Sequence, residues 1–150
     1  MISYATIYNP VPSLVGSRLL DQMDHVKTYK EIRCNSLTTG LFIELNSGST
    51  VTLNFASIDD LNSRLNSFMS FAQETIADKD QQSYALSRIQ DTRLTIGCVI
   101  KPGLDPDSDN NDNQVLDLLF EINNRLSGLL LLNDAIWDYD AKCLTDEVAE

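Results

Sequence analysis

The sequence has few of the residues that supply metal ligands, nucleophiles and phosphate-binding loops. Its 150 residues include one histidine, His25, together with three cysteines and six glycines. A single histidine provides no second imidazole for a zinc site. The glycines are isolated and form no G-x-G-x-x-G, P-loop or G-x-S-x-G motif. These absences argue against the common nucleotide-binding and hydrolase folds.

The cysteines are Cys34, Cys98 and Cys143, which form no C-x-x-C pair and leave at least one thiol unpaired. This pattern is typical of a reducing compartment, so we expect a cytoplasmic protein. Cys98 has apolar neighbours, and we expect a packed, inert thiol because burial raises the pKa of a thiol. No apolar run approaches the roughly 20 residues of a membrane span. Residues 1–10 also lack the basic region that opens a secretory signal, so we expect a soluble protein.

Basic residues are scarce, above all in the last third of the chain. Residues 1–100 carry eight Lys/Arg and ten Asp/Glu, whereas residues 101–150 carry three and twelve, a net charge of −9. Such charge repels phosphate backbones and anionic lipids, which argues against nucleic acid or a membrane as the partner. It attracts a basic protein. The alternative is that the acidic surface only keeps the protein soluble.

The length and the hydrophobic fraction of 43% fit one globular domain over residues 1–150. Alternation predicts a strand over residues 2–8, which two nearby prolines end. Ser13 is then placed to cap a helix reaching about Lys27. On that helix His25 falls opposite the apolar stripe, so we expect it in solvent and assign it no catalytic role.

The clearest local signal is a β-hairpin. Residues 41–45 and 51–55 alternate on either side of a four-residue turn that contains Gly48. Two helices are predicted after it, over residues 58–76 and then through residues 84–89.

The last third contains the predicted core. Residues 94–100 are almost continuously apolar, which is typical of a buried strand. A broadly apolar helix over residues 114–127 follows, ended by Gly128, and residues 129–132 form a second buried strand. We therefore expect a right-handed βαβ unit in which the two strands pair in parallel.

These elements predict an α+β fold with a mixed β-sheet and helices mainly on one face. The fold contains the βαβ unit near its C-terminus and the hairpin in its N-terminal half. Residues 135–138 and 142–144 are expected to form a closing hairpin around Tyr139 and Asp140.

An aspartate-rich segment over residues 104–113 resembles the opening of a calcium loop. Asp105, Asp107 and Asp109 occupy alternate positions, which suits hard cations. The match then fails, because the sixth position is Asn110 rather than Gly and the twelfth is Leu116 rather than Glu. The favoured alternative is a solvated, mobile loop whose last residues cap the next helix. We therefore expect no cofactor and leave calcium or magnesium binding open.

A second acidic group consists of Asp134, Asp138 and Asp140, around Trp137 and Tyr139. Carboxylates beside aromatic rings after a βαβ unit suit a binding site. They also suit the turns of a hairpin, which we favour.

The leading functional hypothesis is a non-enzymatic protein-interaction domain, such as an inhibitor, an immunity-type protein or an adaptor, that docks a basic protein. The alternatives are a divalent-metal enzyme or sensor that uses the aspartate-rich segment, and a nucleic-acid mimic. Self-association is left open. Because the βαβ unit places several acidic groups at one end of the sheet, we expect them to share one surface. The predicted partner-binding residues are Asp105, Asp107, Asp109, Asp112, Asp117, Glu121, Asp134 and Asp138.

Overall fold

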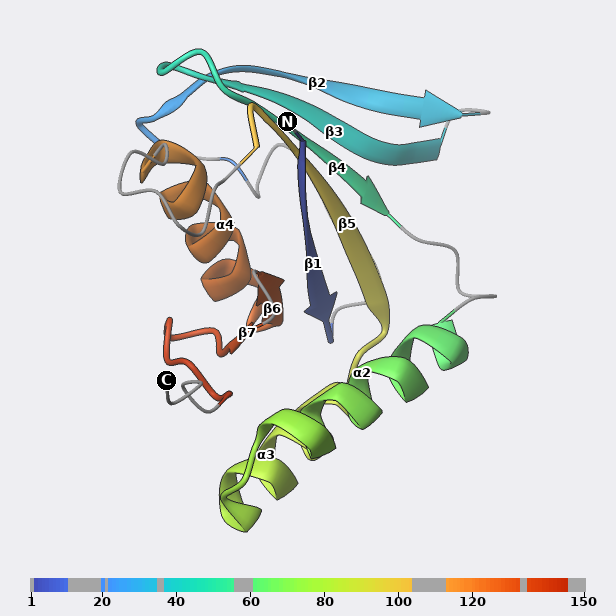
Figure 1. The fold of residues 1–150 in the computed structure, drawn as a ribbon. Coiled ribbons are helices and arrows are strands. Elements are labelled where there is room, and N and C mark those ends of the chain that lie inside the picture. Colours follow the sequence, from blue (N-terminus) through green and yellow to red (C-terminus); the bar gives the residue numbers. More distant parts are fainter. Residues whose placement is uncertain are drawn as a thin grey trace.

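A computed structural model describes residues 2–10, 20, 22–34, 37–55, 61–103, 113–132 and 135–145 of the chain. This part of the chain has an α+β fold, as predicted, in which three helices accompany a seven-stranded sheet (Figure 1). The elements are β1 (Ser3–Asn9), β2 (Val26–Cys34), β3 (Leu37–Leu45), β4 (Thr50–Phe55), α2 (Leu61–Thr75), α3 (Lys79–Gln90), β5 (Leu94–Lys101), α4 (Asn113–Leu126), β6 (Leu129–Leu132) and β7 (Ala135–Trp137).

The sheet has the strand order β2-β3-β4-β5-β1-β6-β7, and each neighbouring pair is antiparallel. The prediction of a mixed sheet is therefore wrong. The predicted parallel pairing of β5 with β6 is also wrong, because β1 lies between them and pairs with both. Strands β5 and β6 still run in the same direction, since both are antiparallel to β1. They form a split βαβ arrangement with α4 as the connection.

Near the C-terminal end of β1 both faces of the strand are buried, as expected for a strand in the middle of a sheet. Ile7 and Tyr8 are adjacent in the strand, so their side chains point to opposite faces. Ile7 is fully buried in the core cluster that α4 covers, whereas Tyr8 belongs to the cluster formed with α2 and α3. The ring of Tyr8 stacks on that of Phe68, with ring centroids 3.9 Å apart.

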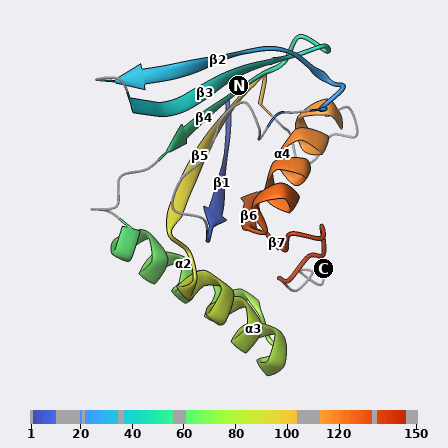
Figure 2. The same ribbon diagram turned by 180° about the vertical axis from the view of Figure 1, so that it is seen from behind.

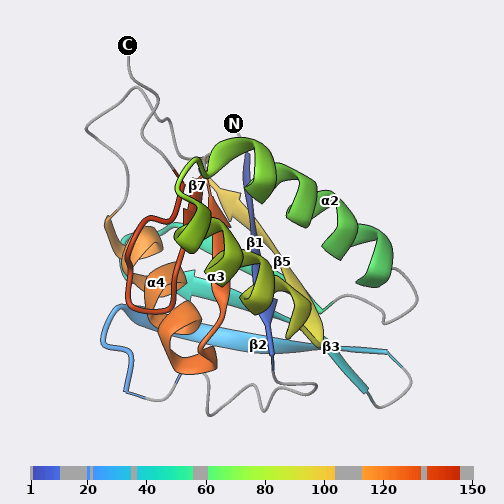
Figure 3. The ribbon, with the colours of Figure 1, turned by 90° about the horizontal axis from the view of Figure 1, so that it is seen from below.

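The helices therefore lie on both faces of the sheet, with α2 and α3 together on one face and α4 on the other. Figures 1 and 2 show α4 beside β1 and β6, and show α2 and α3 at the end of the sheet where β1 finishes. The view from below shows α2 and α3 lying side by side across that end (Figure 3). None of the helices in the described ranges is long and apolar enough to cross a membrane.

The N-terminal third differs from the expected helix. Residues 22–25 form turns, and the chain enters β2 at Val26, so the predicted helix does not extend to Lys27. Residues 11–19 and 21, where that helix would begin, lie outside the described residues. The local apolar spacing favoured a helix, but the long hydrogen-bonded ladder with β3 prevails.

The predicted hairpin is confirmed as β3 and β4, which pair from Gly40–Asn54 to Glu44–Thr50. Gly48 has a φ of 96° in the connecting turn, the conformation for which a glycine was expected.

Helix α4 ends in a Schellman motif, in which the residue with positive φ is Ser127 rather than the predicted Gly128. The amide of Ser127 donates to the carbonyl of Asn124, and that of Gly128 donates to the carbonyl of Asn123. Gly128 is required for a different reason. A Cβ atom there would lie 2.8 Å from the carbonyl oxygen of Tyr8, so only glycine lets α4 end so close to β1.

Candidate functional site

The polar face of α4 supplies the first acidic residues of the candidate site. Its apolar face is buried against the sheet, as the sequence predicts. Asp117 and Glu121 lie on the opposite, exposed face, four residues apart and therefore one above the other. Glu121 also forms an ion pair with Arg125, with 3.1 Å between Oε1 and Nη2.

The second part of the site is the turn between β7 and Cys143. The amide of Asp138 donates to the carbonyl of Lys142 at 2.8 Å, and the amide of Ala141 donates to the carbonyl of Asp138 at 3.0 Å. Trp137 forms a β-bridge with Cys143, so the predicted closing hairpin is confirmed. The tip of the turn presents Tyr139 and Asp140 to solvent.

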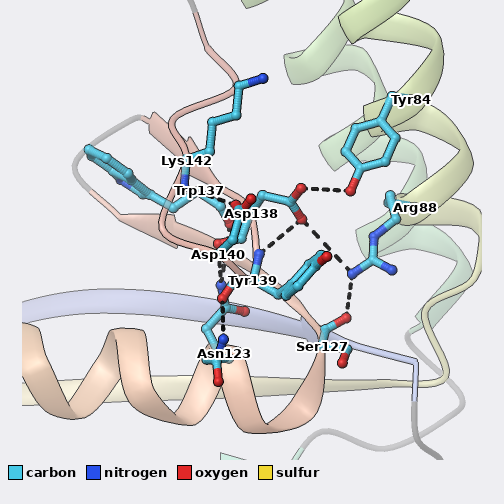
Figure 4. Close-up of polar contacts among 10 residues, drawn as sticks. Tyr84, Arg88, Asn123, Ser127, Trp137, Asp138, Tyr139, Asp140 and Lys142 are labelled. Carbon is cyan, nitrogen blue, oxygen red and sulfur yellow. Dashed lines mark hydrogen bonds and ion pairs between the residues drawn. The ribbon is translucent and has the colours of Figure 1, made fainter.

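Two consecutive asparagines of α4 hold this turn in place. Asn123 is fully buried, and its Nδ2 donates to the carbonyls of Trp137 and Asp138 at 3.3 and 3.2 Å (Figure 4). The Nδ2 of Asn124 donates to the carbonyl of Tyr139 at 3.0 Å. Because strand β7 runs antiparallel to β6, the turn lies beside the end of α4. It does not lie beyond the carboxyl end of β6, where we expected Asp138.

An open hollow of about 440 Å³ lies between α4 and the turn, and we call it the acidic hollow. Three carboxylates border it, one each from Asp117, Glu121 and Asp140. Phe120 and Tyr139 provide its aromatic surface, and the remaining lining residues are His25, Asn124 and Ala141.

The two aromatic walls are held by contacts behind them. Phe120 packs edge-to-face against Trp137, with ring centroids 5.3 Å apart and an interplanar angle of 86°. The guanidinium of Arg88 lies over the ring of Tyr139, 5.6 Å from its centroid. Both rings are therefore positioned by the fold itself rather than by a ligand.

Asp138 occupies a different position from the three carboxylates of the acidic hollow. It is only 5% exposed, and its carboxylate accepts hydrogen bonds from the hydroxyl of Tyr84 at 2.6 Å and from the amide of Tyr139 at 2.9 Å. Arg88 lies 4.0 Å from its Oδ1 and donates to the carbonyl of Ser127 (Figure 4). Asp138 therefore joins α3, the end of α4 and the turn.

The environment of Tyr84 shifts its titration. Partial burial is the largest cause, and the hydrogen bond to Asp138 and the charge of that carboxylate add to it. Together they raise the pKa of Tyr84 to about 12. A smaller hollow of about 370 Å³ lies on this side of the turn, bordered by Tyr84, Asp138, Tyr139, Asp140 and Lys142 among others. Of its polar side chains, those of Tyr84 and Asp138 are used in the internal contacts just described.

The other five predicted partner-binding residues lie outside the described residues, namely Asp105, Asp107, Asp109, Asp112 and Asp134. In the ranges that the structure describes, no group of three or more His, Cys, Asp or Glu residues has a geometry that could hold a metal ion. Calcium or magnesium binding by the aspartate-rich segment stays a prediction. Cys98 is buried, as expected for a packed thiol, and burial raises its pKa to about 12.

His25 is less exposed than the sequence predicts. It is half-buried in the turn before β2 and borders the acidic hollow. Its Nε2 is buried and has no hydrogen-bond partner among the described residues. No local signal indicated this position, because the other residues that line the hollow lie more than ninety positions away in the chain.

The sequence matches no protein-family model, no curated protein and no solved structure.

Proposed function

We propose that this protein is a non-enzymatic interaction domain that docks a basic protein partner through the acidic hollow. An inhibitor, an immunity-type protein or an adaptor, acting in the cytoplasm, fits this role. The observation that carries the proposal is that Asp117, Glu121 and Asp140 border one hollow beside Phe120 and Tyr139.

This combination suits a lysine or arginine side chain of the partner. Such side chains have an apolar stem and a cationic head, so they bind where an apolar wall leads to a carboxylate. The rings of Phe120 and Tyr139 suit the stem, whereas Asp117 and Asp140 suit the head. An arginine is favoured, since its planar guanidinium both stacks on aromatic rings and forms paired hydrogen bonds with a carboxylate.

Preorganisation supports the same conclusion. Asn123 and Asn124 hold the turn against α4, and Trp137 and Arg88 hold the two rings. A site whose groups are already positioned loses less conformational entropy when a partner binds. The net charge of −11 adds long-range attraction for a basic protein and raises the association rate at low salt.

The test is binding of a fluorescent oligo-arginine peptide, measured by anisotropy and by stopped-flow mixing. The double variant Asp117→Asn/Asp140→Asn should weaken binding about tenfold, since it removes two carboxylates that face the cation. The matched control is Glu74→Gln/Asp91→Asn, which makes the same charge change at two exposed positions away from the hollow. It should change the affinity less than about twofold.

The salt dependence gives a second readout. The association rate should fall steeply from about 0.01 M to about 1 M salt, because the screening length shortens from roughly 30 Å to roughly 3 Å. If the two double variants lost the same amount of affinity for the peptide, binding would depend only on net charge. That result would contradict a specific site at the acidic hollow. A rate that does not respond to salt would reject electrostatic steering by this surface.

A further inference from the structure

The two edges of the sheet differ in how their backbone is covered. Strand β7 has three residues, and the segment after the turn lies along its outer side. There the amide of Leu144 donates to the carbonyl of Ile136 at 2.8 Å, and the amide of Ile136 donates to Oγ1 of Thr145 at 3.4 Å. Strand β2 has nine residues, and no other strand of the described part pairs with its outer side (Figure 1).

The open edge is also basic, in contrast to the chain as a whole. Strand β2 carries Lys27, Lys30 and Arg33 against one acidic residue, Glu31, while the whole chain has a net charge of −11. Arg33 is neutralised by Glu31, and Lys27 lies 3.5 Å from Glu44 of β3. Lys30 is exposed in the middle of the strand, and no ion pair is recorded for it within the described ranges.

The arrangement of these charges disfavours a second copy of the chain as the occupant of the edge. In an antiparallel pairing of two β2 strands centred on Lys30, the Lys30 side chains of the two copies would lie opposite each other. Like charges that face each other across a ladder are destabilising. A strand with a carboxylate at this position is instead attracted.

We propose that β2 is a strand-addition site for an extended acidic segment of another protein. Residues 28–32 pair with β3 without interruption, between two irregularities of register, so they offer a regular ladder to a new strand. Lys30 lies at its centre and would face a carboxylate of the added strand. Strand β2 contributes no lining residue to the acidic hollow, and its edge attracts an acidic partner, whereas the hollow attracts a basic one.

Apolar contacts on both sides of the edge favour alternating side chains in the added strand. Tyr29 and Ile32 are exposed and project on opposite faces of β2. A hollow of about 390 Å³ also runs along the start of the strand, bordered by Met23, Val26 and Tyr29 among others. Main-chain hydrogen bonds supply affinity in such complexes, and these contacts supply selectivity.

The test uses a labelled peptide of alternating glutamate and valine residues, titrated into the whole protein. Saturable binding should appear below about 1 mM peptide. The variant Lys30→Glu should weaken it about tenfold, because attraction becomes repulsion. The control Lys79→Glu makes the same change at an exposed position in the first turn of α3, and should leave the affinity within about twofold. Circular dichroism establishes that both variants are folded.

A second peptide separates strand addition from general charge attraction. This peptide has the same sequence, but methyl groups replace the amide hydrogens along one edge of the extended peptide. It therefore keeps its charge and loses the main-chain donors of that edge. This peptide should bind about tenfold more weakly. Equal binding of the two peptides, no binding of either, or no effect of Lys30→Glu would overturn the proposal. A doubled mass of the free protein in sedimentation that Lys30→Glu changes would overturn it as well, since the edge would then be occupied by a second copy.

Discussion

The hydroxyl of Tyr84, on helix α3, lies 2.6 Å from Oδ2 of Asp138 in the C-terminal turn. The two residues are far apart in the chain, and Asp138 is almost fully buried. A buried carboxylate is stable only where donors surround it. Tyr84, the amide of Tyr139 and nearby Arg88 fill that requirement and thereby fix the turn that presents Tyr139 and Asp140 to the acidic hollow.

Replacing Tyr84 by Phe should lower the free energy of unfolding by about 1–3 kcal/mol at neutral pH, because a buried carboxylate loses a hydrogen bond. Denaturant unfolding measures this change. The control is Tyr4→Phe, which removes a hydroxyl from a side chain that is 70% exposed. If the two variants were equally stable, the contact with Asp138 would not hold the turn.

Tyr84 should also contribute to the loss of stability in alkali. Its pKa is raised from the ordinary value of 10 to about 12 in the folded protein, so the folded state holds this proton more tightly than the unfolded chain. That stabilisation is complete below pH 10 and is lost as the pH rises to 12. Tyr84→Phe should therefore show a shallower decline of unfolding free energy over this interval than the parent protein. Identical slopes would contradict the raised pKa.

The buried face of α4 should be sensitive to truncation. Leu119 and Ile122 are fully buried under the sheet. Replacing either by Ala should lower the free energy of unfolding by about 2–5 kcal/mol, through lost burial and the cavity that remains. Ile2→Ala serves as the control, since Ile2 is 44% exposed, and it should lower the stability by less than about 1 kcal/mol. A similarly small effect at Leu119 would mean that α4 does not pack as described.

The fold should tolerate alanine in place of Gly97 but not in place of Gly128. At Gly128 a new Cβ would lie 2.8 Å from the carbonyl oxygen of Tyr8 and 3.0 Å from Oδ1 of Asn123, so Gly128→Ala should destabilise by about 1–3 kcal/mol. At Gly97 the nearest atom would be 3.9 Å away, so Gly97→Ala should be neutral or slightly stabilising. Thermal unfolding of both variants checks the contrast. A neutral Gly128→Ala would show that α4 and β1 are less closely packed at that point.

The sequence by itself determined the elements whose signal is local. The alternation of residues 41–45 and 51–55 around Gly48 specified the β3–β4 hairpin, because both the turn and the pairing lie within a few residues of one another. The two faces of α4 followed from helical spacing in the same way. Both predictions depend on contacts between neighbours in the chain.

Only the tertiary structure decided which distant segments meet. A period-two pattern says which side of a strand is buried, but it does not say which strand pairs with it. The sequence therefore could not show that β1 separates β5 from β6. Nor could it show that His25 would meet Asp117 and Asp140 at one hollow. The backbone ladder is chemically the same for every strand, so packing of the whole core selects the partners and, with them, the site.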